Sequence, residues 1–441
     1  MEKINFKPTT KVEKVNIVLF ILAGLIISIG IGIFWLTYGI LAFLGICIFA
    51  IIITALSIKV KSSYDYEINS ENEIIINYKF INKFSSTIRI DQITSVSMNQ
   101  SFLEKIAGVY TIRFGIFGKN NILGTNGKIG AHQQGFDSQE LLTLNKNKAD
   151  EVFNHLLTLT NSESKKIQQK EKPKVFAHNF LFFLFTLVFW FLVPFLIISF
   201  IKTKKTSYLI TENSLVYQYN YFLGSYKNVV PLDKLTNSEI RKNVITYALF
   251  NIGHISTFTG GSNDPVFSSF EKYSDFSNKI TTYMDGKIAE KPIMEERPGS
   301  SYFSTFFFWY SIFFGILFTL YYYFGSNSIE IQLVKTAIVI TLSLLYIGGL
   351  LLRYILYKVT SYQIYTNKVV DISGIINITS KEIPLEKIKY VEVRQNLFFE
   401  RLLKQGTIHI YTPGSSSVDN KLYALEKHKE LFDSLVEYLE E

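Results

Sequence analysis

The chain alternates between long apolar runs and stretches in which apolar and polar residues take turns. The apolar runs cover residues 17–58, 176–201 and 302–357. Runs of this length predict membrane segments, because a helix needs about 20 consecutive apolar residues to cross a bilayer. The alternating stretches that follow them predict short β-strands with one buried face. We therefore expect a membrane protein that carries water-facing β modules.

The stretches after the three runs repeat one another. Each opens with a Tyr-x-Ile pattern, which begins at Tyr66, Tyr208 and Tyr362. Each then contains a matching hexad, and copies two and three also share prolines and glycines at equal separations. The hexads are residues 88–93, 230–235 and 383–388, and the shared residues are Pro231, Gly253 and Gly261 in copy two and Pro384, Gly406 and Gly414 in copy three. A repeat of this length is typical of an array of similar units rather than one globular enzyme.

Each module is expected to end in an amphipathic helix, because apolar residues recur there at helical spacing. The apolar positions are Ala149, Val152, Phe153, Leu156 and Leu157 in the first copy, Phe276, Ile280, Tyr283 and Met284 in the second, and Leu431, Phe432, Leu435, Val436 and Leu439 in the third. In the second copy, Asp264 and Pro265 predict the start of the helix as N-cap and first helical residue.

Length and charge set the expected topology in the membrane. Runs one and three are long enough for two crossings each, with turns expected at residues 37–39 and 325–328. The ends of these runs that face the modules carry Lys or Arg and the turns carry none, so the positive-inside rule places the modules in the cytoplasm. The middle run leaves two alternatives, a single span or a re-entrant helix pair bent near Pro194. Lysines on both of its flanks favour the re-entrant pair, which keeps all modules on one side.

Composition agrees with a chain divided between lipid and water. Hydrophobic residues make up 48% of it and aromatic residues 15%, and the formal net charge is +8. The aromatic residues gather in and beside the apolar runs, as membrane spans and their interfaces favour. The single cysteine, Cys47, lies inside the first run, so the chain contains no disulfide framework, which agrees with cytoplasmic modules.

With these motifs the sequence resembles the membrane-flanked bacterial pleckstrin-homology-like (PH-like) family, in which such modules follow transmembrane hairpins. Copy three is the most similar, with its Tyr-x-Ile opening, its Ile-Pro-Leu-x-Lys-Ile hexad and Thr412 to Ser415. Copy one departs from the pattern at Arg89 and in a Gly-rich insert over residues 115–135. The resemblance implies that each module is a partly open barrel of two antiparallel sheets with a C-terminal helix at one end.

The expected organisation assigns every part of the chain. The parts are a cytoplasmic tail (1–16), transmembrane hairpin 1 (17–58), module 1 (59–160), a basic linker (161–175), the middle membrane segment (176–201), module 2 (202–286), a linker (287–301), transmembrane hairpin 2 (302–357) and module 3 (358–441).

Catalytic chemistry has little support in the sequence. The six histidines lack metal-ligand spacing, and the Gly-rich loop at residues 124–130 lacks the first glycine and the hydroxyl residue of a phosphate-binding loop. We therefore predict a protein that is not an enzyme and needs no cofactor. Transporters place ionisable groups inside the bilayer, and here Lys335 and Arg353 lie near the ends of their spans.

The predicted function is to display PH-like modules at the cytoplasmic surface of the cell (inner) membrane, for protein assembly or lipid-headgroup binding. The alternative is a transport or lipid-handling role. Membrane lipids are expected partners, nucleic acid is not, and the resemblance suggests a single-module PH-like membrane protein or self-association. The basic residues expected to meet lipid or partner are Lys202, Lys204, Lys205, Lys381, Lys387, Lys389, Arg394, Arg401 and Lys404.

Overall fold

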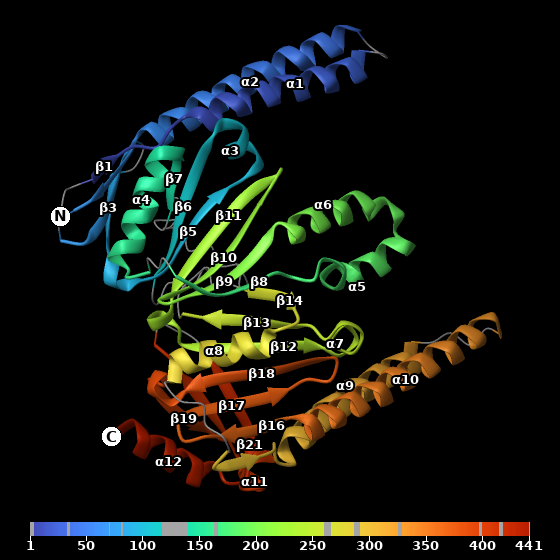
Figure 1. The fold of residues 1–441 in the computed structure, drawn as a ribbon. Coiled ribbons are helices and arrows are strands. Elements are labelled where there is room, and N and C mark those ends of the chain that lie inside the picture. The colour runs from blue at the N-terminus through green and yellow to red at the C-terminus, as the bar shows by residue number, and fades with distance from the viewer. Residues whose placement is uncertain are drawn as a thin grey trace. The chain divides into compact units, whose positions relative to one another are not determined.

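The chain folds into two compact units, each built from antiparallel sheets and helices (Figure 1). The computed structural model describes residues 4–32, 36–69, 71–80, 83–116, 140–162, 166–259, 266–285, 292–324, 329–396, 399–413 and 418–440. Unit 1 comprises Met1–Leu235 and Phe258–Lys272, and unit 2 comprises Thr236–Thr257 and Tyr273–Glu441. The division falls inside residues 202–286, which the sequence analysis assigns to module 2.

Unit 1 contains two sheets around one hydrophobic core. The first sheet has the order β1 (Ile4–Phe6), β2 (Tyr64–Ile68), β3 (Glu73–Lys79) and β4 (Lys83–Arg89). The second has the order β7 (Glu140–Asn145), β6 (Val109–Ile116), β5 (Ile93–Gln100), β11 (Gly224–Pro231), β10 (Ser214–Tyr221), β9 (Thr206–Thr211) and β8 (Ile167–Glu171). Alternate residues of β2 and β3 are buried, as the period-two pattern predicts. Strand β14 (Val266–Phe270) also belongs to this unit.

The helices of unit 1 include two apolar pairs. Helices α1 (Lys11–Gly32) and α2 (Leu36–Ser62) run side by side as a hairpin (Figure 1). Helices α5 (Val175–Val188) and α6 (Val193–Lys204) are joined by the 3-10 turn η2 (Trp190–Leu192). The others are the short helix α3 (Phe102–Ala107), α4 (Lys146–Leu159), and the 3-10 turns η1 (Ile90–Gln92) and η3 (Leu232–Lys234).

Unit 2 repeats this plan. Its first sheet contains, in order, β13 (Gly253–Phe258), β12 (Asn237–Asn243), β18 (Asn377–Pro384), β17 (Lys368–Ser373), β16 (Ser361–Ile364) and β15 (Met294–Glu296). Its second sheet has the order β19 (Tyr390–Arg394), β20 (Gly406–Tyr411) and β21 (Asn420–Leu425). The helices are α7 (Val244–Phe250), α8 (Tyr273–Asp285), the apolar pair α9 (Ser301–Phe324) and α10 (Ile329–Val359), α11 (Phe399–Leu402), α12 (His428–Glu440) and the 3-10 turn η4 (Leu385–Lys387).

Two of the predicted terminal helices are confirmed, and the start of the third is wrong. All five apolar positions predicted for α4 are buried, and Leu431 and Leu435 of α12 are buried as well. Helix α8 begins at Tyr273, because residues from Val266 alternate between exposed and buried and form strand β14. Asp264 and Pro265 lie outside the described residues. Tyr283, predicted for the buried stripe of α8, is 40% exposed.

One of the two predicted hairpin turns is wrong, and the other is not tested. Residues 37–39, expected to form the first hairpin turn, lie inside α2, whose apolar helical pattern continues through them. The residues that join α1 to α2, and residues 325–328 between α9 and α10, lie outside the described part of the chain.

The shared prolines and glycines have clear structural roles. A proline in such a hexad also suits the start of a strand, but Pro231 and Pro384 end strands β11 and β18 and precede η3 and η4. Gly253 and Gly406 begin β13 and β20, where an added Cβ would lie 2.5 Å from the ring of Tyr273 and 2.7 Å from the ring of His428. These glycines therefore let the first residue of α8 or α12 pack on the sheet. Gly261 and Gly414 lie outside the described residues.

Within the described part of the chain, four helical segments are long and apolar enough to cross a membrane. They are Lys11–Ile29, Ile40–Ser62, Ser301–Tyr322 and Thr336–Val359. The middle run instead forms two short helices that fold back on each other, since Asn179 of α5 bonds Ser199 and Thr203 of α6. How this pair lies in a bilayer stays a prediction.

Candidate membrane junctions and module edges

The backbone follows the same path into all three apolar helix pairs. A strand before each pair (β1, β8 or β15) lies antiparallel to the strand after it (β2, β9 or β16). An exposed basic residue and a buried proline follow, namely Lys7-Pro8, Lys172-Pro173 and Arg297-Pro298. The next N–H donates to a carbonyl near the end of the sheet, from Thr9 to Thr143 (2.8 Å), Lys174 to Ser269 (2.8 Å) and Gly299 to Ala424 (2.7 Å).

The three accepting residues share an unusual backbone conformation. Thr143, Ser269 and Ala424 have φ of 44°, 58° and 54°, in the left-handed region that side chains with a Cβ disfavour by roughly 1–2 kcal/mol. The cost is offset because this conformation turns each carbonyl toward its junction. Residues of three different types hold the position, so the backbone bond is what they have in common.

The tyrosine that opens modules 2 and 3 forms a hydrogen bond beside the same left-handed residue. The N–H groups of Ser268 and Tyr423, each just before a left-handed residue, donate to the phenol oxygens of Tyr208 and Tyr362 at 3.0 Å. Burial raises the pKa of Tyr208 to about 12 and also raises the pKa of Tyr362, so both phenols stay neutral. The repeat tyrosine therefore ties the first strand of the module to the junction.

The exit from each helix pair is equally short. Helices α2, α6 and α10 end at Ser62, Lys204 and Val359, and strands β2, β9 and β16 begin at Tyr64, Thr206 and Ser361. A hydroxyl at each exit donates to a carbonyl four residues earlier, from Ser63 (2.7 Å), Thr206 (2.9 Å) and Thr360 (2.8 Å). Each helix pair therefore continues into a sheet without a flexible linker.

Side chains hold each pair together near its base, by a different chemistry in each case. Lys61 of α2 pairs with Glu13 of α1 at 2.5 Å, with the two side chains 15% and 3% exposed. In unit 2 the guanidinium of Arg353 lies 3.8 Å from the ring centre of Tyr302, a cation–π contact between α10 and α9. The middle pair uses the Asn179 amide bonds described above.

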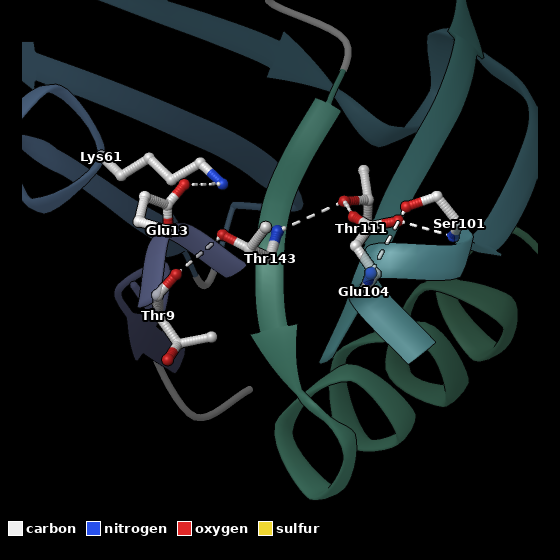
Figure 2. A network of polar contacts seen from close by, with 7 residues as sticks. All are labelled: Thr9, Glu13, Lys61, Ser101, Glu104, Thr111 and Thr143. Atoms are coloured by element: carbon white, nitrogen blue, oxygen red, sulfur yellow. Dashed lines mark hydrogen bonds and ion pairs between the residues drawn. The ribbon is translucent and has the colours of Figure 1, made fainter. Parts of the chain in front are cut away.

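Figure 2 shows a polar relay that connects the short helix α3 to the first junction. Glu104 accepts bonds from the Ser101 N–H (2.8 Å) and the Thr111 hydroxyl (2.5 Å). The Thr111 oxygen accepts from the N–H of Thr143 (3.3 Å), whose hydroxyl and carbonyl both bond the backbone of Thr9. Helix α3 is thus tied through β6 and β7 to the residue that precedes α1.

Unit 2 contains the same relay at α11. Glu400 accepts from the Asn396 N–H (2.6 Å) and the Thr407 hydroxyl (2.6 Å). The Thr407 oxygen accepts from the N–H of Ala424 (3.1 Å), whose carbonyl receives the junction N–H. The recurrence in two separate units shows that the relay belongs to the repeat.

A family model for the bacterial PH domain matches residues 17–160 and 314–439. The chain belongs to the bacterial PH domain family. The resemblance inferred from the sequence is therefore confirmed for modules 1 and 3, which are matched together with apolar helices that precede them. PH-like domains are generally non-catalytic binding modules. The search of curated proteins finds no match.

The basic residues predicted to meet lipid or partner are not equally available. Lys381 donates to the carbonyl of Asp419 and is half-buried, and Lys202 lies 4.6 Å from the ring centre of Tyr219. Arg394 is bonded to Glu392, and Lys387 lies 3.3 Å from Glu386. Lys204, Lys205, Lys389, Arg401 and Lys404 are exposed.

Sequence reasoning missed the functional parts that precede the apolar runs. The signal was available, since a basic residue followed by proline stands before all three runs. The relay glutamates Glu104 and Glu400 were missed too. Glu104 had a signal in the capping-box pattern Ser101-x-x-Glu104, whereas Glu400 is not part of such a pattern.

Two strand pairs join parts of the chain that lie far apart in sequence. Strand β5 pairs with β11 and β12 pairs with β18, both antiparallel. Val96 and Ser238, which stand at the same place after their hexads, lie opposite Val229 and Glu382, which each directly precede a hexad. The two pairings thus use the same register.

Proposed function

We propose that this protein is a non-enzymatic scaffold of the bacterial inner membrane. In this proposal three PH-like modules, including the middle one, are held at the cytoplasmic surface by their helix pairs and assemble through their sheet edges. The partner is a second copy of the chain or a single-module PH-like membrane protein. The junctions support this role, because anchors that run straight into sheets fix the distance between module and bilayer.

The observation that carries the proposal is the repeated edge pairing. Strand β4 is the equivalent in module 1 of β11 and β18, the strands that lead into the hexads of modules 2 and 3. Strand β19 is the equivalent in module 3 of β5 and β12, the strands that follow the hexads of modules 1 and 2. Within the described residues, each has a strand neighbour on one side, β3 for β4 and β20 for β19. An edge strand offers a row of free N–H and C=O groups to another chain.

The shared register predicts how these two edges would meet. With the same alignment to the hexads, Val391 would lie opposite Thr87 and Glu392 opposite Ser86. The side chains of Lys83, Ser85, Thr87 and Arg89 along β4 are exposed. Because the two edges are different surfaces, the pairing is head-to-tail and can extend to rings or chains.

Cysteine cross-linking between copies tests this assembly. Two differently tagged chains in a Cys47→Ala background would carry Ser86→Cys and Glu392→Cys, and would be coexpressed and oxidised in membranes. We expect a disulfide-linked pair that contains both tags. Ser85→Cys is the matched control, because its side chain points to the opposite face of the strand. Absence of the linked pair, or equal linkage through Ser85→Cys, would contradict head-to-tail pairing.

The cytoplasmic location of the modules needs its own test. Single cysteines at the exposed positions Asn154, Asn213 and Asp433 would be treated in intact cells with an impermeant maleimide. Protection of all three is expected. Labelling at Asn213 and Asp433 alone would make residues 176–201 a single crossing and contradict the proposed topology.

Lipid headgroups are the second proposed ligand of the module surfaces. Lys204 ends α6 and Lys205 follows it, and both residues are exposed. Each basic residue beside an anionic leaflet contributes on the order of 1 kcal/mol, so the pair would help to hold β9 at the headgroup level. The transport alternative has less support, because the ionisable side chains described near the helix bases, such as Glu13 and Arg353, are occupied in holding the pairs together.

A further inference from the structure

The short helices α3, α7 and α11 expose apolar side chains although they belong to the polar parts of the repeat. Each is the next helix along the chain after an equivalent strand, β5, β12 or β19. Ile106 of α3 is 54% exposed, and Leu402 of α11 is 78% exposed. The other exposed apolar residues of these helices and their C-caps are Phe102, Val244, Ile245, Tyr247, Leu249 and Leu403.

Two of these helices lie against the first helix of a membrane anchor. Helix α3 packs on α1 in unit 1 (Figure 1). In unit 2 the ring of Phe399 in α11 lies 5.6 Å from the ring of Phe308 in α9, and Phe308 is itself exposed on a segment apolar enough to span a bilayer. The exposed apolar residues of α3 and α11 therefore continue the apolar surface of the anchors.

The polar relay fixes the height of each short helix on its anchor. Glu104 and Glu400 bind the backbone at the start of α3 and α11, and the chain of bonds ends at Thr9 and Gly299, within two residues of α1 and α9. This series of hydrogen bonds connects each short helix to the residues where its anchor begins. The short helix therefore stays at the level at which the anchor enters the bilayer.

We propose that α3 and α11 insert their apolar side chains into the interfacial layer of the bilayer that holds the anchors. Burial of leucine and phenylalanine side chains away from water is favourable, and aromatic rings prefer the headgroup level. Arg401 in α11 and Lys404 just after it are exposed, and both suit anionic headgroups. Modules 1 and 3 would then touch the membrane at a second point beside their anchors, which fixes their tilt and the direction of their open edges.

This inference rests on the proposed anchoring and is tested with the full chain in vesicles of phosphatidylcholine and phosphatidylglycerol. In a Cys47→Ala background, Ile106→Cys and Leu402→Cys would each carry an environment-sensitive fluorophore. Brominated lipids report contact with lipid, and iodide on both sides of the membrane reports contact with water. Ile26→Cys, on an exposed position of α1, is the control for lipid, and Asn154→Cys, on α4, is the control for water.

We expect brominated lipid to quench the probes at Ile106 and Leu402 at least twofold more than the probe at Asn154, with weak quenching by iodide. Quenching by iodide alone would place the helices in water and overturn the inference. Resistance to both quenchers would also overturn it, since protein would then cover the helices. If the probe at Ile26 is not quenched by brominated lipid, the anchoring itself fails, which separates that failure from a failure of the short helices.

Discussion

Modules 1 and 3 are both attached to an apolar helix pair. The hydrogen bonds at the junction are similar in the two modules, but the contact at the base of the helix pair is different. The relay from Glu104 or Glu400 to a left-handed residue and on to the junction N–H is nearly bond-for-bond the same in both. The contact at the base of the helix pair is not, since module 1 uses the Glu13–Lys61 ion pair and module 3 stacks Arg353 on Tyr302.

The difference shows which requirement is strict. The junction needs a carbonyl that points at one N–H, and a left-handed backbone supplies it whatever the side chain. The base of the helix pair only needs two helices to stay together, which an ion pair, a cation–π contact or an amide can all achieve. Sequence variation is therefore tolerated at the base and constrained at the relay.

The largest effect is expected from breaking the ion pair of module 1. Glu13→Ala would leave the half-buried Lys61 without its partner, which costs about 3–5 kcal/mol for a buried pair. The free energy of unfolding in detergent, measured by pulse proteolysis, should fall by that amount. Glu151→Ala is the control, because Glu151 pairs with Lys148 on the surface of α4 and such pairs contribute about 0–1 kcal/mol. Equal losses from both variants would mean that the base contact is no stronger than a surface pair.

A second difference between the modules predicts a dependence on pH. Asp371 in β17 lies opposite Lys381, where module 1 has the buried Ile76 opposite Ser86. Burial raises the pKa of Asp371 from 3.8 to about 6, against the lowering effect of Lys381, and Glu239 raises it further. The folded chain then binds this proton more tightly than the unfolded chain, so stability rises as pH falls from 7 toward 4.

The test compares wild type with Asp371→Asn, which cannot titrate. Between pH 7 and pH 5, wild type should gain about 1–2 kcal/mol relative to the variant, measured as the free energy of opening of β17 and β18 by hydrogen exchange. A wild-type curve parallel to that of Asp371→Asn would show that the carboxyl titrates normally.

The repeat and its terminal helices could be predicted because their signals are local. The buried stripe of α4 follows from spacing alone, and the hexads mark equivalent strand ends. The predicted start of α8 was wrong, because the residues that follow the expected N-cap and proline form strand β14. Lys381 resembles any surface lysine in sequence, and only the pairing of β18 with β12 and β17 shows that it is half-buried.

The junctions and edge pairings lay beyond the sequence for a different reason. Thr143, Ser269 and Ala424 have no side chain in common, so nothing in their identity marks the left-handed backbone. The partner of β5 is β11, more than a hundred positions away, and both edges are mostly polar. Period-two patterns show which face of a strand is buried, but they do not show which strand lies beside it.

The relay glutamates are expected to contribute equally in both modules. Glu104→Gln and Glu400→Gln each keep the shape but leave one acceptor for two donors, so one bond to a charged group is lost at about 1.5 kcal/mol. Hydrogen exchange at the amides of Thr143 and Ala424 should accelerate about tenfold. Glu151→Gln, on the exposed face of α4, should leave both rates unchanged. Acceleration in one module alone would show that the relay is not a shared device.

The smallest effect concerns the residue that ends each short helix. Gly108 and Lys404 both have left-handed backbones, with φ of 66° and 56°, after α3 and α11. An added Cβ at Gly108 meets no atom within 4 Å, so Gly108→Ala should cost only the conformational penalty of about 1 kcal/mol. Lys404→Gly should gain a similar amount. Lys404→Ala removes the same charge but keeps the strain, so the difference in unfolding free energy between these two variants isolates the backbone. If the two Lys404 variants were equally stable, the left-handed turn after α11 would be free of strain. Module 3 would then differ from module 1 at the end of the short helix as well as at the base of the helix pair.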